Sequence, residues 1–76
     1  MLTPAQQGLF RPLVERAWRT HCRLAQLDAS DRNLRRDWYE AQLLECCEVR
    51  SSSDLDAKRD FEAVMEHFES IVGDSI

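Results

Sequence analysis

Five residues of this chain have side chains that could bind a metal or attack a substrate: His21, Cys22, Cys46, Cys47 and His67. Structural zinc sites usually take cysteines that lie about two to four residues apart on a turn. Adjacent cysteines on a helix instead point about 100° apart. The spacing therefore predicts no metal site and no cofactor. An odd number of cysteines also argues against a disulfide framework, so we expect reduced thiols.

His21 falls on the apolar face of an expected N-terminal helix, where an unpaired ring would cost about 1 to 3 kcal/mol. We expect a core histidine that is hydrogen-bonded to a backbone carbonyl or to Tyr39. The alternatives are a pH-sensitive interface and a metal ligand. A nucleophile would need an oriented base and a cleft, and the sequence specifies neither. We therefore predict that the protein is not an enzyme.

Charge is distributed unevenly along the chain. Residues 1–36 hold seven arginines and three acids, a formal charge of +4, whereas residues 37–76 hold three bases and eleven acids, a charge of -8. Arg16, Arg19 and Arg23 form a stripe opposite the apolar face of the first helix, here called the arginine stripe. Guanidinium groups suit carboxylate and phosphate partners. The stripe is therefore a candidate contact for nucleic acid or for an acidic partner.

Besides nucleic acid and an acidic partner, a third interpretation is that the arginine stripe is neutralised by acids of the same molecule. The outer side of the last helix carries Glu62, Glu66 and Glu69, here called the acidic face, and like charges at helical spacing repel one another slightly. Packing the arginine stripe against the acidic face would relieve that repulsion. Neutralisation within the molecule is therefore the preferred interpretation of the stripe. The chain as a whole is acidic, with a pI of about 5.0, and this weighs against sequence-specific binding of DNA by the stripe.

These side chains must be positioned by helices, because the segment 13–72 contains no glycine or proline. Apolar residues recur at steps of three and four along it, which is the helical period. We predict a small all-α domain of three helices that occupies residues 1–76, with helices at about 4–27, 31–49 and 54–72. A domain of this size has a thin core.

Capping residues mark the start of each predicted helix. Thr3 is the expected N-cap of the first helix and is followed by Pro4 at the first helical position. Ser30 or Asp31 is the expected N-cap of the second helix. Ser53 precedes an acid by three residues, which resembles a capping box and places the start of the third helix nearby.

The second predicted helix has more apolar surface than one packing face requires. Leu34, Trp38, Ala41 and Val49 define the face assigned to the core, whereas four further residues, Tyr39, Leu43, Cys46 and Cys47, spread over the other side. A helix that is apolar nearly all round is usually buried all round. We therefore predict a protein interface, and a homodimer as its first expected form, at Tyr39, Leu43, Cys46 and Cys47.

The segment from His21 to Gly73 resembles the GemA-like family of small regulatory proteins in Mu-type phages and prophages. The resemblance lies in the order of an N-terminal histidine and leucine, an aromatic pair, a serine turn and a C-terminal apolar helix. The matching residues are His21, Leu27, Trp38, Tyr39, Leu43, Asp54, Leu55, Ala63, Val64, Met65, His67, Phe68 and Gly73. The resemblance implies a phage regulator of host transcription or DNA topology that acts through effects on gyrase. It implies no catalytic residues.

Composition sets the remaining expectations. Hydrophobic residues make up 43% of the chain and charged residues 32%, a balance typical of globular proteins. No apolar run approaches the roughly 18 residues that span a bilayer, and no signal-peptide pattern is seen, so we expect a cytoplasmic protein without a membrane partner.

The leading hypothesis for function is a regulatory interaction module that binds another protein or itself. The alternative is a nucleic-acid-associated regulator that uses the arginine stripe.

Overall fold

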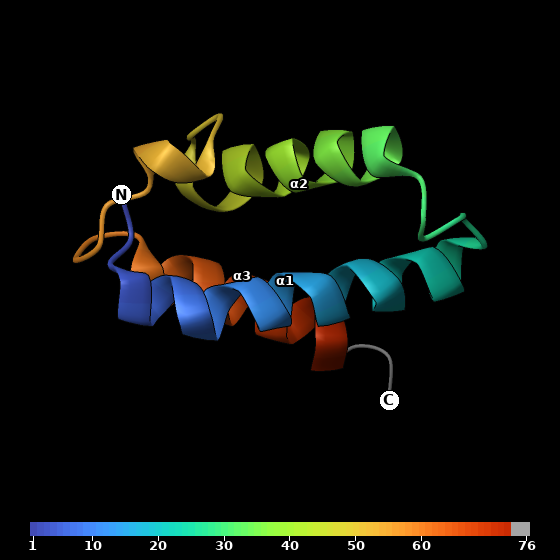
Figure 1. Cartoon of the computed structure of the whole chain (residues 1–76), viewed down its shortest axis with the longest axis horizontal. Helices are drawn as coiled ribbons and strands as arrows, with labels where there is room; N and C mark the ends of the chain where they lie inside the picture. The colour runs from blue at the N-terminus through green and yellow to red at the C-terminus, as the bar shows by residue number, and fades with distance from the viewer. Residues whose placement is uncertain (74–76) are drawn as a thin grey trace.

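The computed structural model of this chain describes residues 1–73, which fold into three α-helices. The helices are α1 at Pro4–Ala25, α2 at Arg32–Cys47 and α3 at Phe61–Gly73, and a short 3-10 turn lies at Ser52–Asp54. Helices α1 and α3 run side by side in the same direction, while α2 runs antiparallel to both (Figure 1). None of the three is long and apolar enough to cross a membrane. The predicted all-α fold is confirmed.

The N-terminus of α1 is held by a capping box at Thr3, the predicted N-cap. Thr3 Oγ1 accepts a hydrogen bond from the Gln6 amide at 3.2 Å, and the Gln6 side chain accepts one from the Thr3 amide at 3.0 Å. Pro12 lies inside the helix without ending it. The helix ends at Ala25 rather than at residue 27, because Gln26 adopts a left-handed conformation with φ of 57°.

The loop between α1 and α2 is fixed by side-chain hydrogen bonds at Ala29 and at Asp31. Trp18 donates a hydrogen bond from Nε1 to the Ala29 carbonyl at 2.9 Å. Asp31 is the N-cap of α2, because its carboxylate accepts hydrogen bonds from the amides of Asn33 and Leu34 at 3.0 and 3.1 Å. The helix ends at Cys47, two residues earlier than predicted, where Glu48 turns left-handed with φ of 58°.

The predicted third helix at 54–72 is wrong in its start, since α3 begins only at Phe61. Leu55 is extended and fully buried, so it anchors the connecting segment in the core instead of opening a helix. A separate turn follows, in which Asp56 accepts hydrogen bonds from two backbone amides at 2.8 and 2.7 Å. Asp60 closes that turn by accepting from the Asp56 amide at 2.8 Å.

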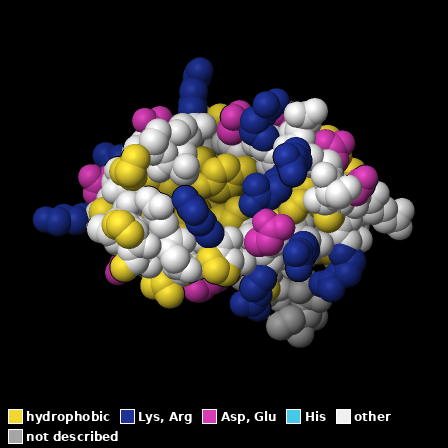
Figure 2. All heavy atoms as spheres, in the orientation of Figure 1, with side chains coloured by type: hydrophobic (Ala, Val, Ile, Leu, Met, Phe, Trp, Pro, Cys, Tyr) yellow, Lys and Arg dark blue, Asp and Glu magenta, His cyan; other side chains and the backbone are white. Residues whose placement is uncertain are grey.

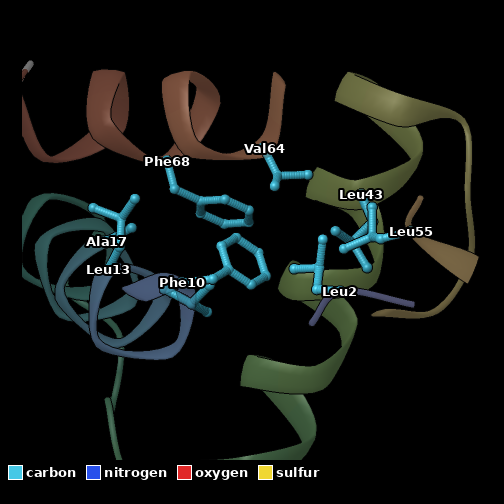
Figure 3. Close-up of a cluster of buried hydrophobic side chains, with 9 residues drawn as sticks. Leu2, Phe10, Leu13, Ala17, Leu43, Leu55, Val64 and Phe68 are labelled. Atoms are coloured by element: carbon cyan, nitrogen blue, oxygen red, sulfur yellow. The ribbon is translucent and has the colours of Figure 1, made fainter. Parts of the chain in front are cut away.

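The core forms where α3 packs against both α1 and α2. The rings of Phe10 and Phe68 meet edge to face with centroids 5.4 Å apart, and Figure 3 shows the two rings facing each other from α1 and α3. Leu43 projects from α2 toward Leu55 and Leu2 in the same view. The buried apolar cluster comprises Leu2, Phe10, Leu13, Val14, Ala17, Leu43, Leu55, Val64 and Phe68.

His21 does not make the hydrogen bond expected of a core histidine. Within residues 1–73 its half-buried ring makes no hydrogen bond to Tyr39 or to a carbonyl. It stacks instead on Trp38, with centroids 5.4 Å apart and planes 24° apart, and lies 6.0 Å from Trp18. A flat ring at the edge of the core thus packs against indoles, and its partial exposure removes the need for a buried partner.

Candidate protein-binding groove

A groove separates α1 from α2 on the side away from α3. Its central hollow, about 290 Å³ in volume, is lined by apolar side chains of Phe10, Val14 and Tyr39. In Figure 2 this hollow is the yellow area near the centre, with Lys or Arg side chains along its right and lower edges. Phe10 and Val14 are anchored in the core, and the Tyr39 ring lies 6.4 Å from Phe10. The floor of the groove is therefore apolar, and packing in the core fixes the positions of Phe10 and Val14.

The groove continues in both directions along the two helices. Toward the N-terminus a second hollow of about 290 Å³ is lined by Leu2, Ser52 and Ser53 among others. Toward the interhelical loop a third hollow of about 530 Å³ reaches Ala29. Tyr39 lines all three hollows, and none of their lining residues comes from α3. The hollows thus adjoin one another along α1 and α2, with Leu2 and the 3-10 turn lining one end and the interhelical loop lining the other.

The rim of this groove is positively charged, although the whole chain carries a formal charge of -4. Its charged lining residues are four arginines and one glutamate, a formal charge of +3: Arg11, Glu15, Arg32, Arg35 and Arg36. Arg35 Nη2 lies 2.9 Å from Glu15 Oε2 and so joins the two walls. Arg35 Nε is buried and has no hydrogen-bond acceptor within residues 1–73. The guanidinium is therefore only partly satisfied.

Tyr39, one of the four residues at which the sequence predicts an interface, lines the floor of the groove. Its phenol is half-buried, and this burial raises its pKa above the ordinary value. The hydroxyl is therefore protonated at neutral pH and can donate a hydrogen bond. A ring with one apolar face and one polar tip is common at binding surfaces.

The prediction that Leu43 lies on a free interface is wrong. Leu43 is 0% exposed and belongs to the buried cluster. Cys46 and Cys47 are half-buried and pack against that cluster. The second apolar face of α2 is covered within the chain by α3, by Leu55 and by Leu2. The surplus surface from which a homodimer was inferred is therefore largely core.

The cysteines are arranged for packing. Burial is the main cause that raises the pKa of Cys46 to about 12, and burial also raises the pKa of Cys22. A protonated thiol is a poor nucleophile and a poor metal ligand. Within residues 1–73 no three His, Cys, Asp or Glu side chains are grouped closely enough to hold a metal ion. His67 instead forms a 2.7 Å hydrogen bond with Gln42, which links α3 to α2.

The arginine stripe is exposed along its whole length. Arg19 pairs with Glu15 at 3.8 Å on the same helix. Arg16 and Arg23 form no ion pair with any residue in 1–73, and no ion pair joins the stripe to the acidic face of α3. The preferred expectation of internal neutralisation is therefore wrong for the described part of the chain. The stripe faces solvent because α1 meets α3 through its apolar side.

The floor and rim of the groove were not identified as a site from the sequence. Phe10 and Val14 carry the same periodic signal as any core residue. The one available signal is local charge: Arg11 and Glu15 are four residues apart on one helix, beside the apolar face. Pairing of Glu15 with Arg35 depends on how far α1 and α2 stand apart, and periodicity does not reveal that separation.

No protein-family model, no curated protein and no solved structure matches this chain.

Proposed function

We propose that this protein is a non-enzymatic interaction module that binds a segment of another protein in the groove between α1 and α2. The groove itself is the observation that supports the proposal, since its floor of Phe10, Val14 and Tyr39 is apolar and no residue in 1–73 fills it. Protein sites that take a helix or peptide commonly combine an apolar floor with a few polar groups at the rim.

We propose further that this binding serves regulation, as in the phage proteins that the order of residues from His21 to Gly73 resembles. A regulator that works by binding needs neither nucleophile nor metal. The thiols of Cys22, Cys46 and Cys47 are free, which agrees with a reducing, cytoplasmic setting. The partner would then be a protein of the same compartment.

The photo-reactive residue p-benzoylphenylalanine in place of Arg11 tests the site directly. Arg11 is exposed and lines the groove, so the probe would touch any segment bound there. After irradiation of host cells we expect a covalent adduct with one predominant protein, identified by mass spectrometry.

The same probe in place of Glu62 is the matched control, because Glu62 is exposed on α3 and lies outside the groove. We expect it to give no such adduct. Equal adducts from both positions, or none from Arg11, would show that the groove is not the binding site.

The arginine stripe supports a second candidate function, which is binding to a nucleic-acid backbone. Its three guanidinium groups are exposed, and two of them lack an ion pair within residues 1–73. If three phosphates are contacted, affinity for duplex DNA should fall roughly 40-fold between about 50 and 200 mM salt. Fluorescence anisotropy measures this dependence, and replacing Arg19 and Arg23 with alanine should flatten it. Binding that is insensitive to salt would rule this function out.

A further inference from the structure

We infer that the occupant of the groove is an acidic amphipathic helix of a partner protein, an inference that rests on the proposed function. The shape of the site is the first reason. Helix α3 packs against α1 and α2 from one side, and the groove opens between the same two helices on the other (Figures 1 and 2). A helix laid in the groove would complete a four-helix arrangement.

The length of the site also suits a helix. The molecule is 34 Å long, and the groove runs between two of its long helices from the N-terminal end to the interhelical loop. A helix of about 18 residues is roughly 27 Å long and about 10 Å wide. Such a helix would place apolar residues at steps of three and four over Phe10, Val14 and Tyr39.

Charge determines which kind of helix fits. The rim carries a formal charge of +3, and its one acid, Glu15, is already paired with Arg35 and Arg19. Arg11 and Arg32 are exposed, and no ion pair occupies either of them within residues 1–73. Glutamates on the flanks of a bound helix would meet these arginines, whereas lysines would be repelled.

Arg35 adds a more specific contact. Its Nη2 donates to Glu15, while its buried Nε has no acceptor within residues 1–73. A carboxylate bound at the rim would let Arg35 turn and present the paired nitrogens of its fork. This contact would satisfy the nitrogen that the free protein leaves without a partner. The groove thus offers a carboxylate site directly beside its apolar floor.

A pair of designed peptides tests the inference. Both have 18 residues, the same Leu and Trp stripe and one lactam bridge on the outer face, and they differ only in flanks of Glu or Lys. Calorimetry should show the acidic peptide binding about tenfold or more tightly than the basic one, with the difference shrinking as salt is added. Amide shifts in NMR spectra should map to Phe10, Val14 and Tyr39.

Charge reversal at the rim supplies the variants. The double variant Arg11→Glu, Arg32→Glu should reverse the preference between the two peptides, and both positions are exposed, so the fold should persist. Arg16→Glu is the control, because Arg16 is exposed on α1 but does not line the groove. It should leave the preference for the acidic peptide unchanged.

The outcomes separate this inference from the proposed function. Equal binding of both peptides in the groove would overturn the acidic occupant while supporting the groove as a binding site. If neither peptide binds but the Arg11 probe still captures a partner, the acidic occupant is again overturned. A dimer in light scattering that the double variant abolishes would identify a second copy as the occupant instead. Duplex DNA that displaces the acidic peptide would overturn a protein occupant.

Discussion

Replacing Leu43 with glutamate is expected to unfold this protein rather than merely separate it from a partner. Leu43 is 0% exposed, and removing a buried leucine side chain costs about 2 to 5 kcal/mol. An unpaired carboxylate in the same place costs several kcal/mol more. A domain of this length has a total stability of about 4 to 11 kcal/mol. Circular dichroism at 222 nm should therefore show loss of helix at room temperature and no cooperative melt.

Leu44→Glu is the matched control for this substitution. Leu44 is the next residue of α2 and is 47% exposed, so a charge there stays in water. Surface changes of this kind usually alter stability by about 0.5 kcal/mol or less. We expect Leu44→Glu to melt close to the parent protein. A Leu43→Glu protein that remains helical and melts cooperatively would contradict the packing of α2 described above.

Local chemistry made much of the helical architecture predictable. Thr3 and Asp31 are N-caps in the structure because their side chains satisfy amides that a helix leaves free. Such signals depend only on near neighbours along the chain. The helical spacing of apolar residues, which places Val64 and Phe68 four residues apart on the core side of α3, is a signal of the same local kind.

Features that depend on long-range packing were not predictable in this way. Ser53 and Asp56 resemble a capping box, but burial of Leu55 competes with helix at that point, and α3 begins at Phe61. Likewise, Leu43 lies on the second apolar face of α2, and periodicity does not reveal whether this chain or another covers that face. The groove has the same origin, because it depends on the distance between α1 and α2.

Phe68→Ala is the second substitution with a large expected effect. Phe68 is 0% exposed, and its ring lies 5.4 Å from Phe10, 5.8 Å from Trp38 and 6.1 Å from Tyr39. Truncating a buried phenylalanine costs about 3 to 5 kcal/mol, which is a large part of the stability of so small a domain. Urea unfolding should show a much lower midpoint, with the slope of the free energy against urea unchanged.

Two further substitutions show whether this loss comes from the centre of the core. Phe61→Ala removes a ring of the same size from the first turn of α3, where it is only half-buried, so its midpoint should fall less. Phe68→Leu keeps most of the volume and should also be milder. Equal losses for Phe61→Ala and Phe68→Ala would contradict a core centred on Phe68. Because Phe68 supports Phe10 and Tyr39, its loss should also weaken peptide binding in the groove, which ties the shape of that site to the packing of α3.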